Sequence, residues 1–241
     1  MDTDQPPSIT GLRSLHIAAV AVALSVVLAL ISGCGTGRRH ISTTTETTPL
    51  TFDKRVAEAY LFDTEIEYRD KYSSVRLELY AADSIVGVAG RSYLGKGALD
   101  GWLTRDSVLI LFPSSGEYVE EAVPDLIGAI ECTNGTVAQI DLLTLLYEQP
   151  SRSNVGTGIS ITPDSANQDR PCYSLSMPGC LWRIDLCYDR REIGWRIREF
   201  SYTNGDNLSI SARRREYKAE VTAGPDKFAV TIPPDALRIS P

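Results

Sequence analysis

The residues able to do chemistry are few, and the histidines among them decide what is excluded. The 241-residue chain holds only two, His16 and His40. His16 directly precedes a long apolar run and His40 lies in a polar stretch, so neither is expected in a folded core. Ser-His-Asp catalysis, Cys-His catalysis and the usual zinc sites are therefore excluded. We expect a protein that is not an enzyme and needs neither a metal nor a cofactor.

Carboxylates and basic residues offer little more. Pairs such as Glu120 and Glu121, or Asp185 and Asp189, are expected at solvated strand and turn positions. A strand rather than a helix follows residues 95–97 (GKG), so nucleotide binding is not expected. The formal charge of -7 also disfavours nucleic acid as a partner.

The amino-terminal residues are typical of a targeting segment. Fifteen residues, Ile17 to Ile31, are apolar apart from one serine and carry no charge. A spanning helix needs about 20 apolar residues, so this run favours a signal peptide. Ile31-Ser32-Gly33-Cys34 follows and resembles the bacterial lipobox, which implies cleavage before Cys34 and acylation of its new amino terminus. The alternative is an uncleaved anchor helix with an incidental cysteine.

Three segments follow from this interpretation: a leader over residues 1–33, the lipidated Cys34 with a polar tether over 34–50, and a folded domain over 51–241. The acyl chains on Cys34 would make membrane lipid the first partner of this cell-envelope protein. Gly35 is not the acidic residue that retains some bacterial lipoproteins in the inner membrane. We therefore expect the periplasmic side of the outer membrane.

The four remaining cysteines are Cys132, Cys172, Cys180 and Cys187. An even number in an exported chain favours two disulfides, with three possible connectivities. A chain reversal centred between Gly179 and Cys180 would bring Cys172 near Cys187, which leaves Cys132 for Cys180. Four free buried thiols are the alternative.

Alternation of apolar and polar residues predicts antiparallel strands joined by short turns. Residues 182–188 place Trp182, Ile184 and Leu186 on one face, and turn residues interrupt several similar runs. Expected strands cover residues 75–81, 84–93, 102–104, 108–112, 117–119, 172–177, 182–188, 195–202, 208–214 and 228–232. Arg213, Arg214 and Arg215 share one strand and must point to both faces, so we expect a solvated edge there.

Three helices are expected beside these strands. Residues 52–62 have apolar residues at helical spacing, and residues 124–130 begin with proline. Residues 136–139 (TVAQ) form a capping box before a run over 137–148 that is apolar nearly all round. Such a helix must be buried in protein or covered by a ligand. The fold class predicted is α+β, mainly antiparallel β, with a curved sheet and helices on its concave face.

The order of weak motifs over residues 51–240 resembles the outer-membrane lipoprotein carrier and receptor superfamily, especially its membrane-anchored receptor branch. These motifs are residues 94–99 (LGKGAL), 106–110 (DSVLI), 116–118 (GEY), 126–127, 142–146, 195–197 (WRI), 208–212 and 228–233 (FAVTIP). It is equally similar to uncharacterised bacterial lipoproteins with that fold. The resemblance implies an antiparallel half-barrel whose apolar concave face is closed by helices and holds acyl chains.

The same resemblance implies a function in lipid or lipoprotein transport and outer-membrane biogenesis. The cavity candidates are Val108, Ile110, Phe112, Leu142, Leu145, Leu146, Trp182, Ile184 and Trp195. An apolar residue on a protruding loop would contact the membrane, and Leu94 is the candidate for it. Each cavity candidate could instead belong to an ordinary core. A second hypothesis is a non-catalytic assembly lipoprotein that uses the half-barrel to bind a protein partner.

Overall fold

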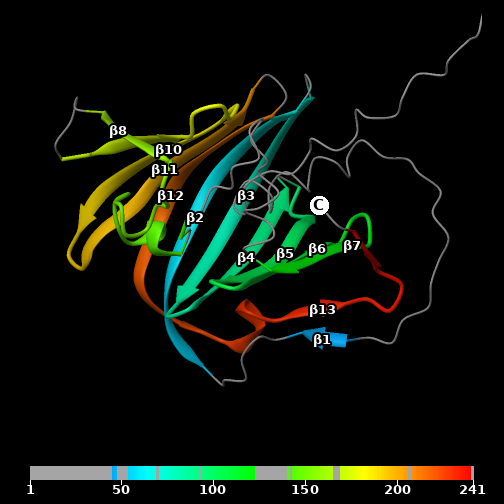
Figure 1. Cartoon of the computed structure of the whole chain (residues 1–241). Coiled ribbons are helices and arrows are strands. Elements are labelled where there is room, and N and C mark those ends of the chain that lie inside the picture. Colours follow the sequence, from blue (N-terminus) through cyan, green and yellow to red (C-terminus); the bar gives the residue numbers. More distant parts are fainter. Residues whose placement is uncertain are drawn as a thin grey trace, which may run out of the picture.

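The computed structural model describes residues 45–47, 54–68, 71–92, 94–122, 140–141, 143–164, 169–205 and 208–239. These residues form an almost entirely β protein (Figure 1). No helix among them is both long enough and apolar enough to cross a membrane. The targeting segment and Cys34 lie outside the described residues.

The described elements are strands and two short 3-10 turns. In chain order they are β1 (Thr45–Thr47), β2 (Arg55–Tyr68), β3 (Lys71–Ala82), β4 (Ile85–Ser92), β5 (Gly97–Thr104), β6 (Ser107–Phe112), β7 (Glu117–Ala122), η1 (Thr144–Leu146), β8 (Ser160–Asp164), β9 (Cys172–Ser176), β10 (Trp182–Arg191), β11 (Gly194–Asn204), β12 (Leu208–Ala223), η2 (Pro225–Lys227), β13 (Val230–Ile232) and β14 (Leu237–Arg238). β1 lies within the segment expected to be a tether.

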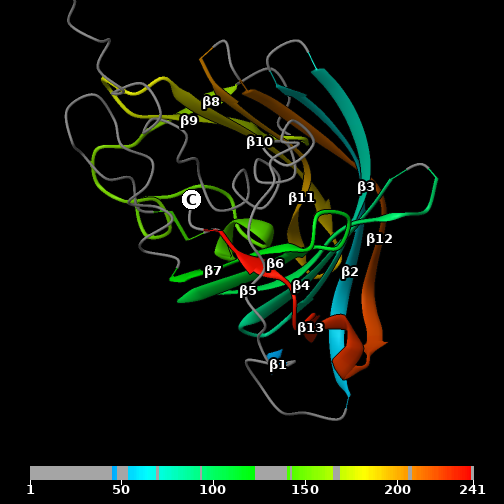
Figure 2. The same ribbon diagram turned by 90° about the vertical axis from the view of Figure 1, so that its right-hand side faces the viewer.

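Twelve strands form one sheet in the order β14-β7-β6-β5-β4-β3-β2-β12-β11-β10-β9-β8. Two meanders, β2–β7 and β8–β12, join where β2 pairs with β12. All pairs are antiparallel except β14 with β7. Figures 1 and 2 show the sheet strongly curved, with β8–β12 as one wing, β4–β7 as the other, and β2 and β3 between them.

The carboxyl-terminal segment covers the outside of one wing. β13 pairs with β1 and lies against β5 and β6, where Phe228, Val230 and Ile232 pack on Trp102 and its neighbours. A second, smaller apolar cluster therefore lies on the convex side of the sheet. Strand β6 is buried on both faces for this reason.

The sequence-based hairpins are confirmed. Leu103 pairs with Val108 across the turn after β5, and Asn204 pairs with Leu208 across the turn after β11. The third hairpin, β9–β10, has the expected centre, since Cys172 lies opposite Cys187. Pro178 and Gly179 in the β9–β10 turn, and Asn204 and Gly205 at the end of β11, reverse the chain where two apolar runs can pair.

The helix expected over residues 52–62 is wrong, because residues 55–62 begin the long strand β2. Tyr60, Phe62 and Ile66 are buried at a period of two, whereas Val56 is 70% exposed. The apolar positions at helical spacing were too few to outweigh pairing with β3 and β12 on both sides.

The expected helix over 137–148 is also wrong within its described part. Ile140 bridges to Val155 in extended conformation, and the Asp141 side chain caps a single 3-10 turn, η1, by accepting from the Thr144 amide at 3.1 Å. The helix expected over 124–130 lies outside the described residues. The predicted α+β class is thus corrected to a nearly all-β fold, since no α-helix occurs among the described residues.

Candidate functional site

The inner face is the concave side of the sheet, and it carries the larger apolar cluster. Both wings contribute to this single cluster. Its strand residues include Phe62, Ile66, Leu77, Leu99, Val108, Ile110, Phe112, Val119, Trp182, Ile184, Leu186, Tyr188, Phe200, Tyr202 and Ile210. Side chains at every second position along each strand point to this face.

The sequence-predicted cavity residues gather in this cluster. Those that it contains are Val108, Ile110, Phe112, Leu145, Trp182 and Ile184, all at most 8% exposed. Leu146 and Trp195 are partly buried and pack against the cluster. Leu142 lies outside the described residues. Residues of β6 and β10, on opposite wings, thus share one apolar interior.

An irregular cover segment, comprising residues 140–141 and 143–159, packs on the inner face of the β8–β12 wing. Leu143, Leu145, Val155 and Ile159 belong to the inner cluster. The buried Tyr188 hydroxyl donates to the Leu145 carbonyl at 3.0 Å. In Figure 2 the η1 turn of this cover lies inside the curve of the sheet.

Two buried ion pairs join strands of the sheet, and the first lies beside the cover. The Arg196 guanidinium donates to both carboxylate oxygens of Glu58 at 2.6 Å, and the Tyr60 hydroxyl donates to Glu58 at 2.6 Å. The Arg196 guanidinium also lies 5.1 Å from the centre of the Tyr147 ring. Burial, together with Glu58, raises the pKa of Tyr147 to about 12. A phenol with that pKa stays protonated and cannot act as a base near neutral pH.

The second pair joins Arg214 of β12 to Asp189 of β10. The Arg214 side chain is 3% exposed, and its Nη2 lies 2.6 Å from each carboxylate oxygen. Its Nη1 donates to the Ile197 carbonyl. The expected solvated positions of Arg214 and Asp189 are therefore wrong, although Arg213 and Arg215 do point outward. Both pairs are charge-neutral and hydrogen-bonded, so they fix the strands rather than offer a reactive group.

Three polar atoms of the inner face differ from these pairs, because no described residue gives them a hydrogen-bond partner. They are Thr64 Oγ1, Trp182 Nε1 and Tyr202 Oη. The three residues are only 2–3% exposed. Sequence reasoning missed Thr64 and Tyr202; the one available signal was a polar group at an inward position of an alternating strand.

Leu94 lies at the tip of the β4–β5 hairpin and is 88% exposed. A register shift at Gly90 and Arg91 bends this hairpin, and Figure 2 shows it projecting from the sheet. Arg91 fixes the bend by binding Asp100 at 2.8 Å and the carbonyls of Gly90 and Leu99.

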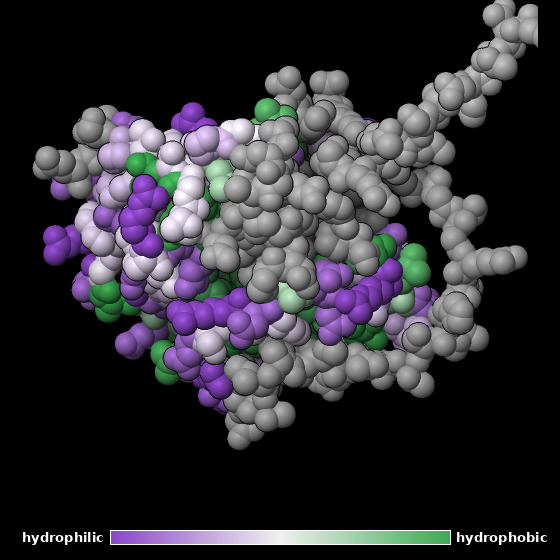
Figure 3. Space-filling view, in the orientation of Figure 1, coloured by the Kyte–Doolittle hydropathy of each residue, from purple (hydrophilic) through white to green (hydrophobic). Residues whose placement is uncertain are grey.

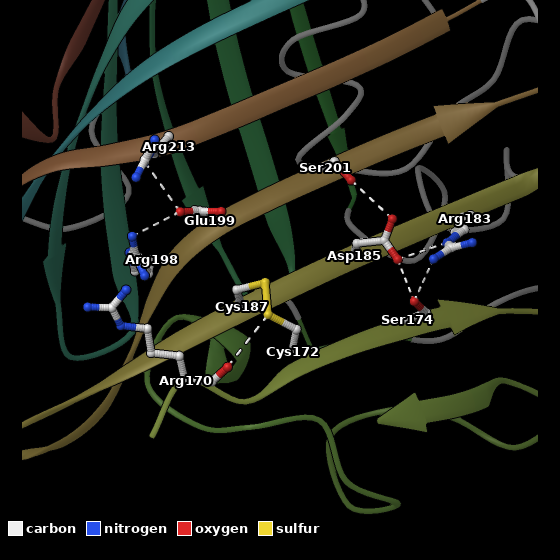
Figure 4. The surroundings of a disulfide bond; sticks show 10 residues. All are labelled: Arg170, Cys172, Ser174, Arg183, Asp185, Cys187, Arg198, Glu199, Ser201 and Arg213. Carbon is white, nitrogen blue, oxygen red and sulfur yellow. Dashed lines mark hydrogen bonds and ion pairs between the residues drawn. A yellow bond between two sulfur atoms is a disulfide. The ribbon is translucent and has the colours of Figure 1, made fainter. Parts of the chain in front are cut away.

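The outer face of the β10–β12 wing, by contrast, is polar. Figure 4 shows Asp185 accepting from Ser174, Ser201 and Arg183, while Glu199 lies between Arg198 and Arg213. A groove of about 530 Å³ crosses this face between β3 and β10. Hydrophilic residues also dominate the described surface seen in Figure 3.

A disulfide joins Cys172 to Cys187 across β9 and β10. This is the pair expected from the turn between these strands. Cys180 is also disulfide-bonded, and Cys132 lies outside the described residues. Disulfides persist in oxidising compartments, so this bond is consistent with an extracytoplasmic envelope protein. Among the described residues, no group of three or more His, Cys, Asp or Glu side chains could hold a metal ion.

Comparison with known proteins finds similarity in fold only. No protein-family model matches the sequence, and no curated protein matches it either. An uncharacterised conserved protein of Thermus thermophilus is 10% identical over 76% of this chain and 89% of its own, with a TM-score of 0.41. A Vibrio parahaemolyticus domain, provisionally named an outer membrane lipoprotein-sorting protein, is 7% identical over 67% and 84%, with a TM-score of 0.36. A DUF1329 family protein of Desulfovibrio piger is 7% identical over 84% and 93%, with a TM-score of 0.35.

Proposed function

We propose that this chain is a lipid-anchored envelope protein that holds the acyl chain of a lipid or lipoprotein against the inner face of its sheet. One observation carries the proposal: a single apolar cluster spans both wings and continues into an irregular cover. An acyl chain lying between the sheet and the cover would touch the residues predicted from the sequence, such as Phe112, Leu145 and Trp182.

Binding of this kind needs no catalysis. Each methylene removed from water contributes about 0.8 kcal/mol, so a chain of ordinary length is retained by burial alone. The protein would act without metal or cofactor, in lipid or lipoprotein transport or outer-membrane biogenesis. Acylated Cys34 would hold it on the periplasmic side of the outer membrane.

Leu94 is the candidate for membrane contact in this proposal. A leucine that is 88% exposed at a hairpin tip can enter a bilayer surface without disturbing the core. Arg91 holds the hairpin in its bent form, so the tip is presented as a preset projection. Cargo could then pass between the membrane and the inner face.

Two neighbouring residues of β12 allow a matched test. Ala212 is 3% exposed and belongs to the inner cluster, whereas Ser211 is exposed on the other face of the strand; both residues line the outer groove. The full chain with Cys34→Ser, which removes the covalent lipid, is purified and its bound lipids are measured by native mass spectrometry. Ala212→Leu should lower bound lipid several-fold by occupying space, and Ser211→Leu should not. Equal lipid in both variants, or none in the parent, would contradict the proposal.

An assembly role is the second candidate, and the outer groove favours it. The groove is lined by charged and hydroxyl side chains such as Glu199, Ser201 and Arg213, which suit a polar protein surface. In this alternative, Ser211→Leu would abolish capture of a protein partner while Ala212→Leu would not.

A further inference from the structure

Two of the unpartnered polar atoms of the inner face lie on neighbouring strands. Trp182 on β10 is opposite Asn204 on β11, which makes Tyr202 its diagonal neighbour, about 7–8 Å away. Thr64 is not part of this group, because it lies on β2 opposite Ala212, two strands away from Tyr202. Trp182 Nε1 and Tyr202 Oη therefore form one polar patch within the apolar cluster.

The chemistry of the patch specifies what it can bind. An indole N–H only donates a hydrogen bond, and the Tyr202 hydroxyl can donate as well. Burial raises the pKa of Tyr202, so its hydroxyl keeps its proton. Buried donors without acceptors destabilise a fold, and native interiors avoid them. Two of them at diagonal positions on one face indicate a missing partner that supplies acceptors.

The acceptor should be uncharged. Arg196 and Arg214, the buried guanidinium groups beside this face, are already bound by Glu58 and Asp189. A carboxylate or phosphate placed at Trp182 and Tyr202 would thus be buried without a counter-ion, which is costly. Ester carbonyls avoid that cost, because they accept hydrogen bonds and carry no charge.

We propose that Trp182 and Tyr202 form a subsite for the ester carbonyls of a diacylglyceryl group, whose acyl chains lie along the inner face. This inference rests on the proposed function, since it names the class of lipid that the cavity holds. Hydrogen bonds from this subsite to the ester carbonyls would fix the position of the acyl chains along the inner face.

Ester-linked and ether-linked lipids of equal chain length test the subsite. The full chain with Cys34→Ser is titrated with a dioleoyl ester phosphatidylethanolamine and with its dialkyl ether analogue, which lacks the carbonyls. The ester lipid should bind about tenfold more tightly, as expected for two neutral hydrogen bonds. Synthetic peptides bearing an S-diacylglyceryl or an S-dialkylglyceryl cysteine repeat the comparison for a lipoprotein source.

Variants that remove only the polar atom complete the test. Tyr202→Phe should reduce the ester preference to about threefold, and Tyr202→Phe with Trp182→Phe should remove it. Tyr202→Phe should keep or raise the melting temperature, because it deletes an unpaired hydroxyl. The matched control is Trp102→Phe, whose indole nitrogen is also unpartnered among the described residues but faces the outer cluster. This control should keep the full preference.

The outcomes separate the two proposals. Equal binding of ester and ether lipids by the parent, or an unchanged preference in the double variant, overturns the subsite but leaves the proposed function intact. Failure of every lipid to bind overturns both. An ester preference in either lipid pair that is lost in the double variant and kept in Trp102→Phe supports the subsite.

Discussion

The two wings of the sheet are built from the same kind of hairpin, yet they are buried differently. In the β4–β7 wing, Val108 to Phe112 form five consecutive buried residues, because the carboxyl-terminal segment covers the outer face. In the β8–β12 wing, Trp182, Ile184, Leu186 and Tyr188 are buried, and they alternate with Arg183, Asp185 and Cys187 on the outer face, where the groove lies. The first wing is a layered structure, and the second is a single layer with one apolar face.

This difference teaches where stability and binding reside. The layered wing is closed on its outside by tight packing: a Cβ added at Gly87 would lie 1.7 Å from the Lys227 carbonyl oxygen. The single-layer wing has instead a disulfide, two buried ion pairs and an irregular cover. The polar patch of Trp182 and Tyr202 belongs to the single-layer wing, which makes that wing the candidate for ligand contact.

The largest effect should come from breaking the outer layer. Phe228 is fully buried in the outer cluster, so Phe228→Ala should lower the free energy of unfolding by about 3–5 kcal/mol. Urea denaturation under non-reducing conditions measures this. Ser201→Ala, on the outer face of the other wing, is the control and should cost under about 1 kcal/mol. Similar losses in the two variants would mean that the wings do not differ in their outer packing.

Removing the disulfide should weaken the other wing. Cys172 and Cys187 close a loop with a sequence separation of 15, for which the loss is about 3 kcal/mol in Cys172→Ala with Cys187→Ala. Hydrogen exchange should become faster in β9 and β10 and remain slow in β5 and β6. A uniform loss of protection across both wings would show that the wings unfold as one unit.

The sequence patterns predicted strands well where one face is buried. The alternation over 182–188 and the turn at Pro178 and Gly179 were enough to place β9 and β10 in register. Prediction failed where the pattern was ambiguous. The apolar run after Ile140 fits a buried helix as well as an extended segment, and only the bridge to Val155 decides between them.

The candidate site was predictable only in its apolar part. Phe112 and Trp182 follow from alternation and size, which a strand pattern contains. The ion pair between Glu58 and Arg196 joins residues 138 positions apart, and the unpartnered Tyr202 hydroxyl is defined by neighbours on other strands. Hydrogen-bond partners depend on tertiary contacts, so no local pattern could indicate them.

The smallest effect on stability is expected at the hairpin tips, where the two wings can be compared through exposed leucines. Leu94 is 88% exposed on the layered wing, and Leu181 is 73% exposed on the single-layer wing. Replacing either by glutamate should change the free energy of unfolding by less than about 0.5 kcal/mol, since neither side chain is packed. Leu94→Glu should nevertheless reduce vesicle binding of the Cys34→Ser chain by at least about tenfold, as expected when about 1.5–3 kcal/mol of leucine burial in the bilayer is lost. Co-sedimentation with phospholipid vesicles measures this, and Leu181→Glu is the matched control that should bind normally. If Leu181→Glu weakens binding as much as Leu94→Glu, the membrane contact extends over both wings and the bent β4–β5 hairpin has no special role.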